Sequence, residues 1–192
     1  MADNFIKRLN NPEIIQVVER DDCEEVTTIE YIIPDEAKQL PNLPKELSEL
    51  INLDIRIERI LALPHDYADI NDFNNKQAGY RYNPITGEYL VSDKKGDWQG
   101  DWYVFATNYF DDPFFIDFTE EARGFPVYYC QHGAGEWKSI KIAETLNHFE
   151  RVLRTLDCKG FDAPFELSEL PLEIDLSNEF WIEVNEEFKK LG

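Results

Sequence analysis

The residues best suited to chemistry are a thiol and an imidazole, Cys130 and His132, which lie two positions apart. Side chains two apart near a strand end project from the same face, so this pair could bind a metal or combine a nucleophile with its base. Two ligands are too few for a metal site, and the other cysteines, Cys23 and Cys158, have no companion at ligand spacing. We therefore expect a structural cysteine and a surface or hydrogen-bonded histidine.

Motifs of the familiar enzyme classes are missing from the sequence. It contains no Gly-rich phosphate loop, no metal-spaced cluster of Cys and His, and no Ser-centred nucleophile elbow. Asp111 and Asp112 share only their composition with a calcium loop, because the alternating ligand spacing is absent. We predict a protein that is not an enzyme and that holds no cofactor and no metal. The catalytic alternative is a hydrolase that uses His132 with Asp117 or Glu136.

Aromatic and acidic residues recur together in residues 96–102, where Gly-Asp-Trp is repeated at a spacing of four. One interpretation is an exposed surface that binds a sugar or a peptide. The other is a loop whose tryptophans cover a sheet. The residue types are compatible with both.

The charge balance of the chain is strongly acidic. Its 192 residues include 39 Asp and Glu against 19 Lys and Arg, a formal net charge of −20. Phosphate backbones and anionic membrane surfaces would repel such a protein, whereas a basic protein would complement it. Solubility alone is a second explanation of the charge. A hydrophobic content of 43% is ample for a core, and the length favours one domain over residues 1–192.

Features of secretion and membrane insertion are not evident. Three cysteines are an odd number without framework spacing, and the first residues lack the apolar core of a signal peptide. No apolar run approaches the roughly 20 residues of a membrane span. We predict a cytoplasmic protein without membrane insertion. Heptads and repeats are absent, so no particular oligomeric state is indicated.

The order of apolar and turn residues predicts an α+β fold. Apolar spacings of three and four over residues 5–20 predict one or two short helices, and β-branched residues predict a strand over 26–33. A polar run rich in Asp and Asn over 66–76 is typical of a loop. Turn-like connections then link a hairpin and three further strands, which favours an antiparallel meander; these elements cover residues 80–91, 102–107, 114–118 and 125–130.

Two amphipathic helices are expected after these strands. The first, over residues 140–156, carries a continuous apolar stripe, with Ser139 as its N-cap and Gly160 after its end. The second covers residues 178–191 in an acidic extension that begins near residue 161, and we expect it to dock on the body of the protein. The elements together predict a mostly antiparallel sheet of five to six strands with helices packed on one side.

The order and spacing of motifs between Tyr80 and Leu156 resemble the SUKH superfamily, which includes bacterial Syd and a fungal regulator of cell-wall synthesis. The motifs that carry this resemblance are Gly100-Asp101-Trp102, the run from Asp112 to Asp117, Pro126-Val127-Tyr128, the run from His132 to Trp137, and Ile142-Ala143 with the helix that follows to Leu153. The similarity covers about two fifths of the chain. Residues 1–25 and 161–192 depart from the pattern.

The resemblance implies an α+β sheet with helices packed against it, in agreement with the prediction above. Many bacterial members look like immunity proteins, which bind and neutralise toxins that are often nucleases. We therefore expect an immunity protein whose partner is a basic protein toxin, such as a nuclease, and not nucleic acid. A regulatory or scaffold protein with several partners, like the fungal relative, is the alternative.

Partner binding is predicted at the loops beside the central strands. Aromatic residues there would serve as buried anchors and carboxylates as a charged rim. Trp102, Asp117 and Trp137 could instead serve the fold by core packing or turn capping. The predicted partner-binding residues are Asp97, Trp98, Asp101, Trp102, Tyr109, Phe110, Asp111 and Asp112.

Overall fold

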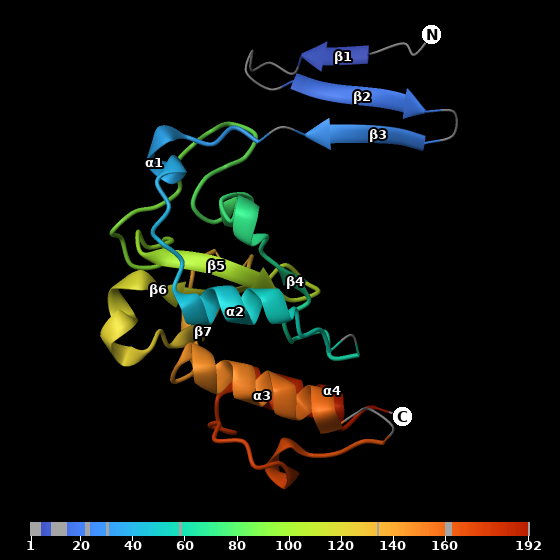
Figure 1. Cartoon of the computed structure of the whole chain (residues 1–192), viewed down its shortest axis with the longest axis vertical. Coiled ribbons are helices and arrows are strands. Elements are labelled where there is room, and N and C mark those ends of the chain that lie inside the picture. The colour runs from blue at the N-terminus through green and yellow to red at the C-terminus, as the bar shows by residue number, and fades with distance from the viewer. Residues whose placement is uncertain are drawn as a thin grey trace.

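A computed structural model describes the backbone and side chains of residues 31–57, 59–133, 135–159 and 163–191. Of residues 1–30, it describes the backbone of three strands: β1 (Phe5–Arg8), β2 (Ile15–Asp21) and β3 (Glu24–Ile29). These strands form an antiparallel sheet in the order β1-β2-β3, which lies at one end of the molecule, apart from the larger sheet (Figure 1).

The helices expected over residues 5–20 are wrong. Strand β1 pairs with β2 from Phe5, opposite Val18, to Arg8, opposite Ile15. Apolar residues at mixed spacings fit a helix or a strand, and the β-branched residues of this segment favour the pleated conformation. The strand expected over residues 26–33 corresponds to β3, which ends at Ile29.

The larger sheet has five antiparallel strands in the order β4-β5-β6-β7-β8. This arrangement confirms the predicted antiparallel α+β fold. The expected hairpin over residues 80–91 is reduced to one bridge, between Tyr82 and Tyr89. The strands are β4 (Asp66–Tyr67), β5 (Trp102–Thr107), β6 (Pro113–Asp117), β7 (Val127–Tyr129) and β8 (Ile140–Ala143).

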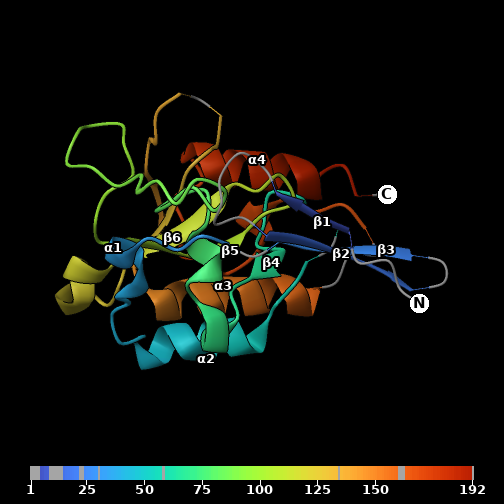
Figure 2. The ribbon, with the colours of Figure 1, turned by 90° about the horizontal axis from the view of Figure 1, so that it is seen from above.

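The two faces of this sheet are covered differently. On one side, which we call the helix face, Phe105 and Phe114 contribute to a large core with three helices, α2 (Lys45–Leu53), α3 (Leu146–Lys159) and α4 (Glu179–Phe188). In Figure 1, α3 and α4 lie below the strands of this sheet and α2 lies in front of them; Figure 2 shows α2 next to α3. The opposite side, the loop face, has a smaller core. Its buried members are Trp98, Val104, Phe115 and Cys130, with Tyr80, Val91, Trp102, Tyr128 and Trp137 packed against them.

Short elements complete the described part of the chain. A single helical turn, α1, precedes α2, and four 3₁₀ turns lie in the connections. Their bounds are α1 (Asp35–Lys38), η1 (Ile70–Asp72), η2 (Asn75–Gln77), η3 (Phe118–Arg123) and η4 (Leu167–Glu169). Among the described residues, no helix combines the length and apolar character that crossing a bilayer requires.

Helix α3 begins later than the sequence indicates. Residues 140–143 form the edge strand β8, and Leu146 is the first helical residue. The N-terminal cap is Thr145, not Ser139, because the His148 N–H donates to Thr145 Oγ1 at 3.0 Å. Ile142 continues the apolar stripe by coincidence, since a strand also buries alternate residues. The expected end at Gly160 lies outside the described residues.

Helix α4 confirms the prediction that the acidic C-terminal segment docks on the body. Phe180, Trp181, Val184 and Phe188 are all buried in the helix-face core. The Asn178 side chain caps the helix by accepting the Phe180 N–H at 3.0 Å. The segment predicted as an extension is therefore part of the same core as the sheet.

One buried histidine beside this core forms few hydrogen bonds with its ring nitrogens. His148, in the first turn of α3, is 8% exposed, and its Nδ1 accepts the Glu144 N–H at 3.4 Å. Its buried Nε2 has no hydrogen-bond partner among the residues described. Burial lowers the pKa of His148 because the imidazolium would lose its hydration, and the nearby Arg151 lowers it further.

We expect this histidine to make the protein less stable in mild acid. Because its pKa is lowered on folding, the unfolded chain takes up the proton first as the pH falls below its own pKa of about 6.5. The contribution is fully present above that value and is lost as the pH falls toward the folded pKa. Urea unfolding between about pH 7 and pH 5.5 should show a steeper loss of stability in the wild type than in His148→Gln. Parallel pH profiles for the two proteins would contradict this assignment.

Candidate functional site

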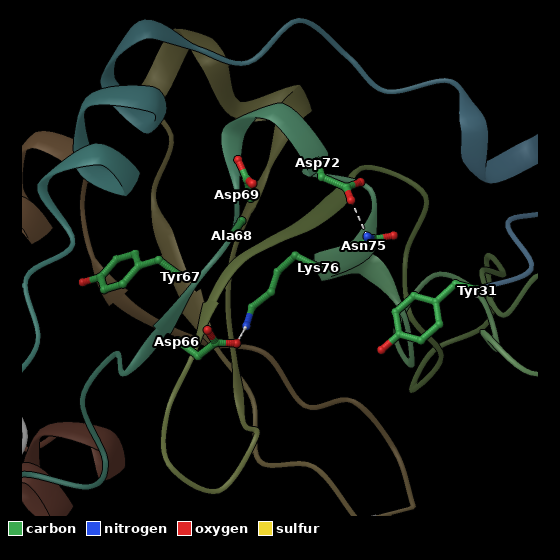
Figure 3. A pocket seen from close by; sticks show the side chains of 8 residues that line it. All are labelled: Tyr31, Asp66, Tyr67, Ala68, Asp69, Asp72, Asn75 and Lys76. Atoms are coloured by element: carbon green, nitrogen blue, oxygen red, sulfur yellow. Dashed lines mark hydrogen bonds and ion pairs between the residues drawn. The ribbon is translucent and has the colours of Figure 1, made fainter. Parts of the chain in front are cut away.

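A hollow of about 750 Å³ lies beside strand β4 and the two 3₁₀ turns that follow it. Asp66 comes from the strand, Asp69 caps the turn η1 by accepting the Asn71 N–H at 2.8 Å, and Asp72 accepts a hydrogen bond from Asn75. Figure 3 shows these carboxylates around the hollow, with the ring of Tyr31 on its far side. The local turns thus gather three acids from seven consecutive residues.

Lys76 is the cation that lines this hollow, and its charge is already engaged. Its Nζ donates to Asp66 Oδ2 at 2.5 Å and to Thr107 Oγ1 at 3.1 Å. The lysine side chain is only 12% exposed. Asp69 and Asp72 have no such ion pair among the described residues, so the hollow keeps a negative balance.

A second hollow of about 550 Å³ adjoins the first, since Tyr31, Asp66, Asn75 and Lys76 line both. It continues to Asp111 and His132 near the loop face. We call the two hollows together the acidic groove. Asp66, Asp69, Asp72 and Asp111 against Lys76 leave its lining at −3 with His132 neutral.

The turn between β5 and β6, residues 108–112, forms one end of the groove. Asn108 Oδ1 holds the turn by accepting the N–H groups of Phe110 and Asp112, both at 2.9 Å. Tyr109 and Phe110 project outward, with 61% and 47% of their surfaces exposed. Their rings meet edge to face at 6.0 Å, so the turn presents an ordered aromatic pair beside the acids.

Asp112 is a buried centre of hydrogen bonding, in contrast to its exposed neighbour Asp111. Its carboxylate accepts the Tyr129 hydroxyl at 2.8 Å, the Asn108 amide at 3.1 Å and the His132 N–H at 2.7 Å. His132 Nδ1 lies 2.8 Å from the same carboxylate. An ionised carboxylate only accepts, so Nδ1 carries a proton there. The network anchors the segment after β7 to the β5–β6 turn.

This geometry changes the catalytic alternative considered from the sequence. The partner of His132 is Asp112 rather than Asp117 or Glu136, because Asp117 caps η3 through the Thr119 N–H at 2.8 Å. Cys130 is fully buried, and burial raises the pKa of its thiol to about 12. A thiol of that kind stays protonated near neutral pH and is a poor nucleophile. Within the described ranges, no group of three or more His, Cys, Asp or Glu side chains is arranged to hold a metal ion.

The predicted partner-binding residues divide into exposed and buried sets. Tyr109, Phe110 and Asp111 lie together on the exposed β5–β6 turn, and Asp101 is also exposed. Two placements are wrong: Trp98 is 1% exposed and fills the loop-face core, and Asp112 is 7% exposed. Neither side chain can meet a partner without rearrangement.

The remaining members have mixed positions. Trp102 is half-buried against Phe115, with ring centres 4.7 Å apart, and Asp97 accepts the Ser92 hydroxyl at 2.5 Å. The tryptophans of the Gly-Asp-Trp repeat therefore cover the sheet, which was one of the two interpretations. Trp137 also packs on the loop-face core, and Asp117 caps a turn, as the structural alternative predicts.

Sequence reasoning missed the acids Asp66, Asp69 and Asp72 as site residues. They lie in the polar run that was interpreted only as a loop. Three acids within seven residues were the available indication, but spacing alone does not show that 3₁₀ turns wrap them around one hollow.

Comparison with protein-family models, curated proteins and solved structures finds no match to this chain. The resemblance to the SUKH superfamily therefore stays a prediction.

Proposed function

We propose that this chain is an immunity-type protein that neutralises a toxin by binding a basic surface on it. The observation that carries the proposal is the acidic groove beside the exposed pair Tyr109 and Phe110. The ordered motifs of residues 80–156 that resemble the SUKH superfamily support the same function. A toxin that acts on nucleic acid would supply the basic surface, because such enzymes must hold phosphates.

The acids of the groove would act mainly on the rate of association. The chain has a net charge of −20, and the groove concentrates part of that charge in a concave surface. Charge complementarity of this kind can raise association rates by roughly 10- to 1000-fold at low salt. Screening weakens the effect as the ionic strength rises.

The aromatic pair would contribute most of the binding energy. Tyr109 contacts His65 at a ring distance of 5.7 Å as well as Phe110, and its N–H donates to the Leu61 carbonyl at 3.2 Å. A side chain that is ordered before binding loses less entropy when a partner covers it. Aromatic anchors of this kind can each contribute about 2 kcal/mol or more.

The direct test is protection of cells that produce a toxin whose gene neighbours that of this chain. Co-expression should restore growth, and the two purified proteins should form a one-to-one complex. Absence of both protection and complex formation would overturn the proposal. Capture of several unrelated proteins without protection would favour the regulatory or scaffold alternative instead.

Neutralising the groove should slow complex formation with that toxin. The triple variant Asp69→Asn, Asp72→Asn and Asp111→Asn removes three charges from the groove and spares the Asp66–Lys76 pair. We expect its association rate to fall roughly tenfold at low salt and to approach the wild-type rate at high salt. Stopped-flow fluorescence at several salt concentrations measures both.

A matched control removes the same number of charges from the helices that cover the other face. The variant Glu46→Gln, Glu49→Gln and Asp157→Asn changes exposed acids of α2 and α3. It should associate within about twofold of the wild type if the field is local to the groove. Equal slowing in both triple variants would show that net charge, rather than the groove, governs association.

A further inference from the structure

A small pocket of about 370 Å³ opens on the loop face, next to the acidic groove. Three aromatic residues form its walls and contact one another: Tyr80, Trp98 and Trp137, with ring-centre distances of 5.2, 5.6 and 5.1 Å. Since Trp98 is buried, its ring belongs to the floor of the pocket, and the other two rings are partly exposed at its rim. The pocket lies near the lower end of the usual range for small ligand sites, roughly 300 Å³, which suits one side chain.

Two carboxylates line the same pocket, from Asp97 and Glu136. The Trp137 N–H donates to the Gly96 carbonyl at 2.7 Å and thereby fixes the Glu136 segment against the Gly96 turn. The approach is close: a Cβ added at Gly96 would lie 3.2 Å from Glu136 Oε2. Residue 96 has a φ of +92°, which also favours glycine. The backbone therefore holds this acid beside the aromatic walls.

Among the described residues, no salt bridge engages either of these two acids. Neither Asp97 nor Glu136 forms an ion pair within the part of the chain that the structure describes, and none of the described lining residues is Lys or Arg. The hydrogen bond described for the Asp97 carboxylate comes from the neutral hydroxyl of Ser92. The pocket thus combines electron-rich ring faces with carboxylates that lack a counter-charge.

We infer that this pocket binds the guanidinium group of an arginine side chain. A planar cation can stack on the faces of Trp and Tyr, and it can donate to carboxylates at the edge of the same plane. A neutral sugar could also stack on the rings and donate hydroxyl groups to the acids, but it would leave their two negative charges without a counter-charge.

The inferred ligand makes the proposed function more specific. That the arginine belongs to a protein partner rests on the proposed function. Gly79, Tyr80, Gly133 and Trp137 line both this pocket and the neighbouring hollow of the acidic groove. A basic segment lying in the groove can therefore place one arginine in the pocket. Binding of guanidinium itself does not depend on the identity of that partner.

The test uses the intact protein and two small probes of nearly equal shape, Nα-acetyl-arginine methylamide and its neutral counterpart Nα-acetyl-citrulline methylamide. Titration is followed by the indole N–H signals of the four tryptophans in ¹H–¹⁵N spectra. The arginine probe should shift the Trp98 and Trp137 signals with a Kd of about 1 mM, and the citrulline probe should bind at least tenfold more weakly. Trp181, buried on the helix face, serves as the internal control and should not move.

Variants separate the charge from the aromatic walls. Glu136→Gln should weaken the arginine probe about fivefold or more, and Glu88→Gln, a charge removal outside the pocket lining, should leave its affinity unchanged. Trp137→Leu tests the wall, and the unchanged Trp181 signal reports that the variant is folded. Equal affinity for the two probes, or an undiminished affinity in both Glu136→Gln and Trp137→Leu, would overturn the inference.

The two proposals can fail separately. Arginine binding at the pocket without protection against any toxin would retain the site and remove the immunity function. Protection and complex formation without arginine binding would retain the function and remove this site.

Discussion

Replacing Trp181 by alanine is expected to lower the free energy of unfolding by about 4 kcal/mol, the largest effect among the substitutions considered. The Trp181 side chain is 1% exposed on α4 and lies against Phe180 at a ring distance of 4.8 Å. Its Nε1–H donates to the Ile142 carbonyl of β8 at 2.8 Å. The substitution therefore leaves a cavity and an unpaired carbonyl group at the edge of the sheet.

The neighbouring residue on the same helix supplies the control. Ile182 is 49% exposed, so Ile182→Ala removes an aliphatic side chain from the same element without opening the core. We expect it to change the free energy of unfolding by no more than about 0.5 kcal/mol. Urea denaturation measures both variants. Similar small effects at the two positions would mean that α4 does not support the core.

The second large effect is expected at Asp112. Asp112→Asn keeps the shape of the side chain but offers one acceptor oxygen, and its amide nitrogen would face groups that already donate. The Tyr129 hydroxyl and the Asn108 amide now donate to Oδ2, and the backbone and ring N–H groups of His132 donate to Oδ1, so either orientation of the new amide leaves one pair of donors without its acceptor. Buried donors left without a partner should cost about 3 kcal/mol in the free energy of unfolding.

Like-charge repulsion at this position opposes that loss but is smaller. Glu183 has a raised pKa chiefly because it is partly buried, and the charges of Glu187 and Asp112 raise it further. Removing the charge of Asp112 relieves only the last of these contributions. Because the hydrogen bonds are direct and buried, we expect their loss to outweigh the relieved repulsion, so that Asp112→Asn lowers the free energy of unfolding.

Asp111→Asn is the matched control, because it removes the same charge one residue away. Asp111 is exposed and has a φ of +63°, a conformation that asparagine tolerates well. Its substitution should shift the unfolding midpoint little, by about 0.5 kcal/mol or less in free energy. If the two variants lose equal stability in urea, the hydrogen-bond network of Asp112 is not what holds the turn.

Strands β5, β6 and β7 could be predicted because each is short, apolar and bounded by turn residues, whereas β4 was predicted as a loop and β8 as the start of a helix. Residues 102–107 and 113–117 have no competing helical pattern, and the turn at 108–112 is too short for a crossover. Helix α4 could also be predicted from the sequence, since its apolar residues share one helical face. They are Phe180, Trp181, Val184 and Phe188, and they follow the N-cap residue Asn178. Local pattern and tertiary packing agree at these positions.

Prediction failed where the local sequence does not determine which other part of the chain packs against a residue. Apolar spacing over residues 5–20 fits either a helix or a strand, and only the pairing of β1 with β2 decides. Trp98 was predicted to bind a partner because it lies in a loop beside carboxylates. Helices α2, α3 and α4 contribute no residue to the loop-face core, so Trp98 and the other described aromatics of the loops cover this face. Asp111 and Asp112 are identical in type, and only the fold distinguishes a surface acid from a buried acceptor.

The unequal covering of the two sheet faces has a consequence for how recognition can change. Loops tolerate insertions and substitutions better than the packed elements that carry them. The aromatic turn and the small pocket are built from connecting segments, and so is the groove apart from Asp66, Tyr67 and Thr107 of the strands, while helices α2, α3 and α4 pack on the opposite face. Substitutions in the lining of the groove and the small pocket can therefore change which partner is bound, while the core formed with the helices on the other face keeps the protein folded.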